Sequence, residues 1–288
     1  MKPEKILMCG GDMRSVYMAD YFRRQGFEVG LYATETEKYE LKQSELSDGI
    51  NGADLVVFGL PAVKNDMSIN CPLSKECVSF EEILNKAAKN TVIAGGRFSH
   101  QAYDMAADYA IRLIDYSTDE VFQIENAFYT AEGAVEAIIK NTVKSLGELK
   151  ILITGYGRIS KALTRIMSSL GAQITVYARK QEQRAWADML GYTAVGSLER
   201  LDSFDVLVNT VPHELLRKKE LNEVKKDALI VDLSARPGYV SRELCENCGI
   251  KLVFLPGLPA VSAPCSAGEA AARAVLRMCS ELTEGDEA

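Results

Sequence analysis

Residues 150–178 read KILITGYGRISKALTRIMSSLGAQITVYA, and residues 5–33 read KILMCGGDMRSVYMADYFRRQGFEVGLYA. Both stretches are 29 residues long, and they align without a gap with identical residues at eight positions. Each runs from a short apolar segment through a glycine-containing turn and an amphipathic segment to a second apolar segment, which is the order of a βαβ unit. We therefore infer that one architecture occurs twice in the chain, about 145 residues apart.

Three more pairs of similar stretches follow in the same order in the two halves. They are 54–61 with 205–212, 90–95 with 227–232, and 111–114 with 250–253. Two βαβ units can look alike through composition alone, but four matches in one order favour a duplicated architecture over chance similarity.

The apolar segments of both halves are typical of strands in a parallel sheet. They are four or five residues long and mostly continuous, as expected of strands that are buried on both faces. The predicted strands are 5–9, 28–32, 55–58, 91–94 and 111–114 in the first half, and 150–154, 173–177, 206–209, 228–231 and 251–254 in the second. With helices between them, they predict two doubly wound, Rossmann-like α/β domains with a cleft between them. We place these domains at residues 1–125 and 126–265.

Three helix starts are predicted from capping residues. Ser79-x-x-Glu82 and Ser266-x-x-Glu269 fit the capping-box pattern, so helices are expected to begin at these two serines. Thr130 is expected to cap a third helix, which runs to about residue 143 and joins the two halves.

The last predicted helix, over about residues 266–282, is rich in alanine and amphipathic. An apolar face on a terminal helix needs a surface to cover it. Two alternatives stay open for the segment 266–288: it packs back on the first domain, or it lies at an interface between copies in a homo-oligomer.

Composition excludes several classes of function. The chain has 288 residues with a formal net charge of −7, which argues against a nucleic-acid or anionic-membrane partner. No apolar run reaches the roughly 18–20 residues that a membrane helix needs, and the start of the chain is not typical of a signal peptide. Seven scattered cysteines and two histidines indicate neither a disulfide framework nor a metal site, and the Cys245-x-x-Cys248 pair lacks partners at zinc spacing. We expect a cytoplasmic protein.

The second half carries the pattern of a dinucleotide site. The stretch Gly155-Tyr156-Gly157-Arg158-Ile159-Ser160 follows a predicted strand and opens a helix, with Ser160 where a third glycine is usual. The first glycine permits the tight turn, the second lets the backbone approach a pyrophosphate, and the helix N-terminus offers free N–H groups. The alternative is a glycine-rich βα turn without a ligand. We assign this half as the cofactor domain and predict contacts from Gly155, Gly157, Arg158 and Ile159.

The end of the second strand of that half favours NADP over NAD. NAD sites usually place Asp or Glu there for the ribose 2′-OH, but residues 173–180 contain no acid. Arg179 and Lys180 follow Ala178 instead, and a guanidinium suits a 2′-phosphate. We therefore predict cofactor contacts from Ala178, Arg179 and Lys180. The alternative is a solvated basic loop. Loops that leave the neighbouring strand ends are expected to line the cofactor as well, through Thr210, Val211, Pro212, Leu233 and Ser234.

The first half is predicted to hold the substrate. Asp12 aligns with Gly157, and a carboxylate there would repel a pyrophosphate, although the helix N-terminus remains an expected anion site. Basic and polar residues follow the predicted strand ends, and they suit a small substrate with carboxylates. These candidates are Arg14, Lys64, Arg97 and Ser99, together with Asp12 itself. For each cation the alternative is an ordinary surface charge.

Seven motifs in one order resemble the family of dipicolinate synthase A subunits. They are Gly10-Gly11-Asp12-x-Arg14, Thr130-Ala131-Glu132-Gly133, Gly155-x-Gly157-Arg158, Asn209-Thr210-Val211-Pro212, Asp232-Leu233-Ser234-x-x-Pro237-Gly238, Leu255-Pro256-Gly257-x-Pro259 and Ala263-Pro264-x-Ser266-Ala267-Gly268. The resemblance spans nearly the whole chain. Two departures from the pattern are Ser160, in place of the third glycine, and Ala235-Arg236, where small residues are expected.

The resemblance implies NADP-dependent oxidation of dihydrodipicolinate to dipicolinate, in the mother cell of a sporulating bacterium, with a flavoprotein-like B subunit of the same synthase as partner. A planar ring with two carboxylates fits the cationic first half. Its aromatisation releases a hydride and a proton, and a general base takes the proton. Glu132, on the segment between the domains, is the first candidate for this base, and His100 is the second. Thr130, beside Glu132, is a third predicted catalytic residue.

Two other functions stay open. One is a D-2-hydroxyacid dehydrogenase, which shares the two-domain plan but needs a catalytic histidine paired to a carboxylate, and no histidine follows His213. The other is a non-catalytic NADP-binding subunit of a complex in which the partner performs the chemistry.

Overall fold

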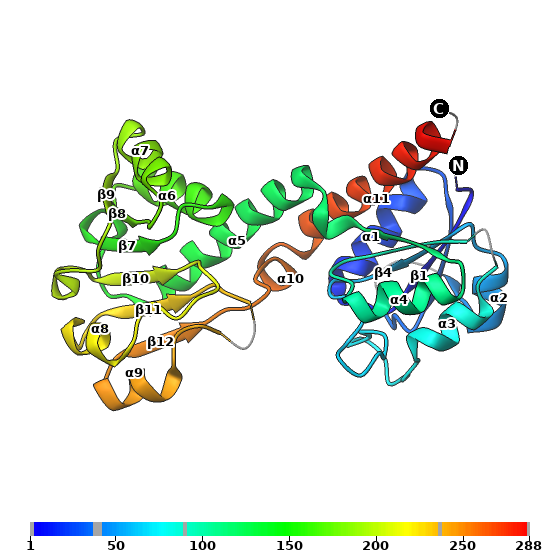
Figure 1. The fold of residues 1–288 in the computed structure, drawn as a ribbon, viewed down its shortest axis with the longest axis horizontal. Coiled ribbons are helices and arrows are strands. Elements are labelled where there is room, and N and C mark those ends of the chain that lie inside the picture. Colours follow the sequence, from blue (N-terminus) through cyan, green and yellow to red (C-terminus); the bar gives the residue numbers. More distant parts are fainter. Residues whose placement is uncertain (1–2, 37–41, 89–90, 236–237, 287–288) are drawn as a thin grey trace. The chain divides into compact units, whose positions relative to one another are not determined.

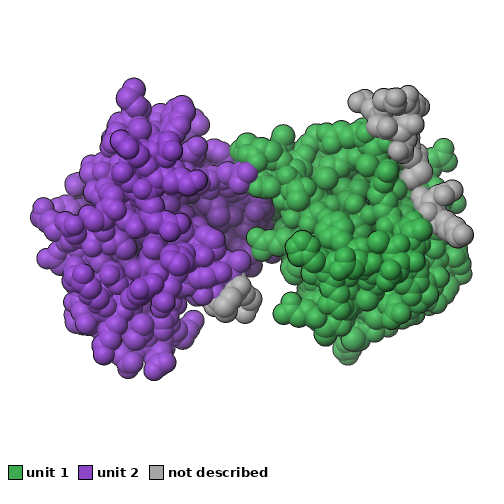
Figure 2. All heavy atoms as spheres, viewed as in Figure 1, with its two compact units in different colours: residues 1–125, 264–288 green, residues 126–263 purple. Residues whose placement is uncertain are grey.

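The computed structural model describes residues 3–36, 42–88, 91–235 and 238–286. The chain forms two compact units, which Figure 2 distinguishes by colour: unit 1 is residues 1–125 and 264–288, and unit 2 is residues 126–263. Each unit contains one six-stranded sheet, and all strand pairs in both sheets are parallel. The predicted fold class of two parallel-sheet, Rossmann-like α/β domains is therefore confirmed.

Unit 1 has the strand order β3-β2-β1-β4-β5-β6, so the sheet grows outward in both directions from β1 and β4. Its strands are β1 (Lys5–Cys9), β2 (Glu28–Tyr32), β3 (Lys42–Gln43), β4 (Leu55–Phe58), β5 (Val92–Gly95) and β6 (Arg112–Asp115). Its helices, drawn in Figure 1, are α1 (Met13–Arg24), α2 (Leu46–Asn51), α3 (Phe80–Lys86), α4 (His100–Asp108), the short η1 (Tyr116–Thr118) and α11 (Pro264–Asp286).

Unit 2 repeats this order as β9-β8-β7-β10-β11-β12. Its strands are β7 (Lys150–Thr154), β8 (Gln173–Tyr177), β9 (Thr193–Val195), β10 (Val206–Asn209), β11 (Leu229–Asp232) and β12 (Lys251–Phe254). Its helices are η2 (Leu146–Glu148), α6 (Arg158–Ser169), α7 (Gln181–Met189), η3 (Leu201–Ser203), α8 (Lys218–Glu223), α9 (Arg242–Cys248) and α10 (Pro259–Ser262). The chain passes from unit 1 to unit 2 within α5 (Glu120–Asn141).

All ten predicted strands are present, and three of them lie one residue further along than expected. The central strands β4, β10 and β11 are buried along their whole length, which explains why continuous apolar runs mark them. The sequence did not predict β3 and β9, because edge strands of two and three residues are too short to show a pattern.

The helix starts were predicted correctly in one case of three. Ser79 caps α3 and accepts the Glu82 N–H at 3.0 Å. The prediction for Thr130 was wrong, because α5 begins ten residues earlier, where Asp119 accepts the Phe122 N–H at 2.7 Å. The prediction for Ser266 was also wrong, because α11 begins at Pro264, whose missing N–H and fixed φ suit the first position of a helix.

Helix α11 belongs to unit 1, where it packs against α1 (Figure 1). A Cβ at Gly268 would lie 2.4 Å from the Arg14 carbonyl oxygen, so a glycine is needed for this close approach. Ion pairs continue the contact along α11, from Glu269 to Arg24 and from Arg277 to Asp119. The C-terminal segment thus has a covered face within its own chain.

Candidate functional site

The glycine turn of unit 2 leaves space beside its backbone. Gly155 has φ +81°, and a Cβ there would lie 2.5 Å from the Val211 side chain, so only glycine fits. Gly157 is the N-cap of α6, and a Cβ there would meet no atom of the described residues within 4 Å. As a glycine, Gly157 brings no side chain of its own to cap the first N–H groups of α6. An open helix N-terminus approached over glycine backbone is the geometry of a pyrophosphate site.

Ser160, which replaces the third glycine, connects α6 to the next strand end. It is fully buried, and its hydroxyl lies 2.8 Å from Thr210 Oγ1. Thr210 donates its single hydroxyl proton to the Thr154 carbonyl at 2.7 Å, so Ser160 is the donor to Thr210. A hydrogen bond thus takes the place of the close helix–strand contact that the third glycine provides in other dinucleotide sites.

A buried polar network joins the carboxyl ends of three strands in unit 2. The Thr154 hydroxyl donates to Asn209 Oδ1 at 2.8 Å, and Asn209 Nδ2 donates to Asp232 Oδ1 at 2.9 Å. The fully buried Asp232 carboxylate also accepts the backbone N–H groups of Ser234, Tyr239 and Val240. Because buried polar groups need partners, this network ties Ser234 on one side of the loop, and Tyr239 and Val240 on the other, to the Asp232 carboxylate. Residues 236 and 237 of that loop lie outside the described residues.

The twelve predicted cofactor contacts all follow carboxyl ends of strands in unit 2. They come after β7 (Gly155, Gly157, Arg158, Ile159), after β8 (Ala178, Arg179, Lys180), after β10 (Thr210, Val211, Pro212) and after β11 (Leu233, Ser234). Arg179 and Lys180 are exposed, whereas Ala178, Leu233 and Ser234 are buried. The Ser234 hydroxyl is buried without a hydrogen-bond partner among the described residues. The structure therefore brings these residues to one edge of one sheet.

A pocket of about 320 Å³, which the sequence did not predict, lies beside the loop after β11. Tyr239, Arg242, Phe254 and Glu214 are among its lining residues. No spacing pattern links these side chains, because they come from three separate segments of the chain.

The equivalent turn of unit 1 is closed by its own chain. Gly11, which aligns with Tyr156, donates its N–H to the Asn70 carbonyl at 2.7 Å. Asp12, which aligns with Gly157, caps α1 and accepts the Arg14 N–H at 3.0 Å. A carboxylate therefore occupies the place of an incoming anion, and the expected anion site at the N-terminus of α1 is not open. Asn70 has no sequence motif that marks it, since it lies in an irregular loop.

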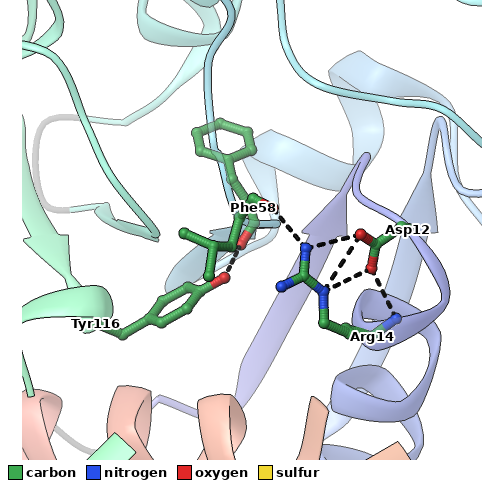
Figure 3. A network of polar contacts seen from close by, with 5 residues as sticks. Asp12, Arg14, Phe58 and Tyr116 are labelled. Atoms are coloured by element: carbon green, nitrogen blue, oxygen red, sulfur yellow. Dashed lines mark hydrogen bonds and ion pairs between the residues drawn. The ribbon is translucent and has the colours of Figure 1, made fainter. Parts of the chain in front are cut away.

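The Arg14 side chain is engaged within unit 1 rather than free for a substrate (Figure 3). Its guanidinium donates to both oxygens of Asp12, at 2.8 to 3.3 Å, and to the Leu60 carbonyl at 2.6 Å. Burial disfavours the charged guanidinium, but the hydrogen bond and charge of Asp12 outweigh it and raise the pKa of Arg14. Beside this pair, the buried Tyr116 hydroxyl donates to the Phe58 carbonyl at 3.3 Å. Asp12 and Arg14 thus fix the loop after β4 in place.

The remaining candidates of unit 1 are exposed. Lys64 lies in the loop after β4, and Ser99 caps α4, whose first residue is His100. Arg97 has φ +57°, a left-handed conformation that is rare for arginine. The Asp115 carboxylate holds it there by accepting the N–H groups of Arg97 and Phe98 at 3.0 and 3.1 Å. Asp115 was not predicted, although an acidic residue at a strand end can be read from the sequence.

The predicted catalytic residues of α5 lie in the middle of that helix. Glu132 is exposed, and because α5 begins at Glu120, its carboxylate does not lie in the first turn of the helix. Thr130 is buried, and its hydroxyl donates to the Asn126 carbonyl one turn earlier at 2.8 Å. Both residues belong to unit 2, whereas His100 belongs to unit 1. None of the described His, Cys, Asp and Glu side chains form a group of three that could hold a metal ion.

Both domains match models of known families. The family model of the N-terminal domain of the dipicolinate synthase A subunit matches residues 5–117, and that of the D-isomer specific 2-hydroxyacid dehydrogenase NAD-binding domain matches residues 121–246. The A subunit of dipicolinate synthase from Bacillus subtilis is 24% identical over 96% of both chains. A dehydrogenase-type NAD-binding domain supports an oxidoreductase that uses a nicotinamide cofactor.

Solved structures share the fold of the whole chain. The dipicolinate synthase A chain from Bacillus subtilis has a TM-score of 0.87 at 23% identity and covers 99% of this chain, which covers 98% of that one. The dipicolinate synthase A subunit from Bacillus halodurans has a TM-score of 0.87 at 21% identity, with 96% and 97% coverage. Salmonella D-lactate dehydrogenase has a TM-score of 0.67 at 14% identity, with 95% and 96% coverage.

In the described part of the chain, no helix is both long and apolar enough to cross a membrane. Taken together, residues 5–117 are similar to the N-terminal domain of the dipicolinate synthase A subunit, residues 121–246 are similar to a dehydrogenase NAD-binding domain, and the chain is similar to the dipicolinate synthase A subunit over nearly its whole length.

Proposed function

We propose that the chain oxidises dihydrodipicolinate to dipicolinate with NADP as the hydride acceptor. One contrast supports this proposal: the turn of unit 2 is open over Gly157, whereas Asp12 and Asn70 close the turn of unit 1. One chain then holds one dinucleotide and leaves the strand ends of unit 1 to the substrate. The similarity to the dipicolinate synthase A subunit supplies the substrate.

The reaction removes one hydride and one proton from the dihydropyridine ring, which becomes aromatic. NADP, when bound, accepts the hydride at C4 of its nicotinamide. The protein itself orients the ring and takes the proton through a general base. Glu132 is the first candidate for the base and His100 the second, because both are exposed; the Thr130 hydroxyl already donates to a backbone carbonyl.

The substrate carboxylates need cations that are free to bind them. Arg97 and Lys64 are exposed at strand ends of unit 1, and the exposed Ser99 follows Arg97 closely. Arg14 is already paired with Asp12, so we assign this pair to shaping the loop after β4 and not to direct contact with a carboxylate.

The cofactor proposal is NADP because of the charges after β8. Arg179 and Lys180 are exposed there, and no acidic residue lies between Gln173 and Lys180. A guanidinium and an ammonium favour the 2′-phosphate, whereas the ribose 2′-OH of NAD would lack the carboxylate that usually binds it.

The partner in this proposal is the dipicolinate synthase B subunit, a flavoprotein-like chain, because the name of the A subunit implies a second component. The test is NADPH formation, followed at 340 nm, from enzymatically generated dihydrodipicolinate with and without the B subunit. Turnover by the chain alone supports the proposal in full. Turnover only with the B subunit makes the chain a cofactor-binding component, and no turnover in either case contradicts the proposal.

D-2-hydroxyacid dehydrogenase activity is the second candidate, because that family's NAD-binding domain model matches residues 121–246. The chemistry of that family needs a histidine base, and no histidine follows His213 in this chain. NADPH oxidation with a series of 2-keto acids tests this candidate, and we expect no turnover.

A further inference from the structure

A side chain of α7 reaches back to the turn that precedes its own helix. The Arg184 Nη1 atom donates to the Ala178 carbonyl at 2.8 Å and to the Arg179 carbonyl at 2.7 Å. These two carbonyls follow β8 directly, so one guanidinium nitrogen holds two successive peptide groups. Arg184 is partly buried, in contrast to the exposed Arg179 and Lys180.

This contact fixes the direction of two N–H groups. Both peptide bonds are trans, and in a trans peptide the N–H points away from the carbonyl. Because both carbonyls point at Arg184, the N–H groups of Arg179 and Lys180 point to the opposite side. Neither of them donates to an acceptor among the described residues. Successive N–H groups on one side of a turn favour an anion.

A glycine lies next to the Arg184 guanidinium. A Cβ at Gly196, just after β9, would lie 3.4 Å from both Cζ and Nη1 of Arg184. The guanidinium thus bonds the β8–α7 turn and lies next to the end of β9. A Cβ at Gly196 would make ordinary contact with it, whereas the additional γ carbons of a valine would crowd it. The backbone of Gly196 is outside the left-handed region, so a substitution there strains no dihedral.

We propose that Arg184 is a positioning residue for cofactor choice. It holds the turn so that Arg179 and Lys180 face the 2′-phosphate with both their side chains and their N–H groups, without itself touching the ligand. This inference rests on the proposed use of NADP. It adds Arg184, which lies in α7, to Arg179 and Lys180, whose charges after β8 favour NADP.

The test compares two adenosine ligands in the full-length chain by calorimetry: adenosine 2′,5′-bisphosphate, which carries the 2′-phosphate, and adenosine 5′-monophosphate, which lacks it. We expect Arg184→Met to weaken the bisphosphate at least tenfold and the monophosphate less than about threefold. Arg184→Lys, whose ammonium can still donate to a carbonyl, restores part of the loss. Gly196→Val keeps every charge and is expected to produce the same selective loss.

Arg165→Met is the matched control, because Arg165 is exposed on α6 and contributes the same charge away from the turn. It is expected to change neither affinity, which excludes a general charge effect. If Arg184→Met leaves the bisphosphate affinity unchanged, or weakens both ligands equally, the positioning role is overturned while NADP use stands. If the wild-type chain itself does not prefer the bisphosphate, the NADP proposal fails, and this inference fails with it.

Discussion

The Ser160 hydroxyl donates to Thr210 Oγ1 at 2.8 Å, whereas the aligned residues of unit 1, Ser15 and Gly59, form no such pair. Ser15 is fully buried and its hydroxyl has no partner among the described residues. Gly59 cannot carry a side chain, because its Cβ would lie 2.7 Å from the Cα of Gly11. The close approach of Gly59 to Gly11 in unit 1 therefore leaves Ser15 without the partner that Thr210 provides for Ser160 in unit 2.

This difference predicts that replacing the serine by alanine changes the free energy of unfolding differently in the two units. Ser160→Ala removes a buried hydrogen bond and is expected to cost about 1 kcal/mol of unfolding free energy. Ser15→Ala removes a buried hydroxyl without a partner and is expected to be neutral or stabilising. Urea unfolding measures both; Trp186, the single tryptophan, reports on unit 2, and circular dichroism covers the whole chain. Equal losses in both variants would refute the assignment of Ser15 as unpaired.

Substitutions of the two glycines of the cofactor turn are expected to differ in effect: one lowers the stability of the fold, and the other weakens NADP binding. Gly155→Ala forces a side chain into a left-handed residue and against Val211, so it is expected to lower the melting temperature of the chain. Gly157→Ala places a methyl group in open space, so the melting temperature stays unchanged, but NADP loses its approach to the backbone. Thermal unfolding and NADP titration of both variants check this, and normal NADP affinity in Gly157→Ala would contradict the site.

Replacement of Arg97 by glycine is expected to stabilise unit 1 and to weaken substrate binding. Glycine adopts a φ of +57° without the strain that arginine experiences, so Arg97→Gly is expected to stabilise unit 1 by up to about 1 kcal/mol. The same variant loses a cation for the substrate carboxylates, so dipicolinate, used as a product probe, is expected to bind at least tenfold more weakly. Unchanged dipicolinate affinity would remove Arg97 from the substrate site. Arg112→Gln removes one positive charge as a control. The exposed Arg112 begins β6, whereas Asp115, which holds the Arg97 backbone, ends that strand.

Asp205 predicts a pH dependence of stability. Burial alone would raise its pKa, but hydrogen bonds from Lys144, the Lys150 backbone N–H and Lys225 lower it well below its ordinary value. A carboxylate with a depressed pKa in the folded chain stabilises the fold above its unfolded pKa of about 3.9 and loses that contribution as the pH falls further. Asp205→Asn is therefore expected to be less stable than wild type at pH 7, with a difference that shrinks below about pH 4. A difference that stays constant down to pH 2 would contradict this role.

The repeat made the fold predictable, because buried parallel strands leave continuous apolar runs at matching positions. The N-terminal half of α5 was missed although Asp119 is a local capping residue, whose carboxylate accepts the Phe122 N–H. The ion pair of Asp119 with Arg277, 158 positions away, leaves no local pattern. The start of α11 was misplaced for a simpler reason: Ser266 fits a capping box, but Pro264 already begins the helix.

The candidate site was predictable in part. The glycine turn and the loops at the strand ends of unit 2 lie where the motifs indicate. The closing of the unit 1 turn was not foreseen, because Asn70 contributes a backbone carbonyl, and any residue has one. Arg14 looked like a free cation in the sequence, and only the structure shows that Asp12 and the Leu60 carbonyl engage it.

The central claim is that one of two similar units kept the dinucleotide site and the other closed it. Calorimetric titration of the full chain with NADP tests this most directly, because it counts sites. We predict one NADP per chain, with binding abolished in Gly157→Ala and retained in Asp12→Asn. Two NADP molecules per chain, or undiminished binding in Gly157→Ala, would contradict the account.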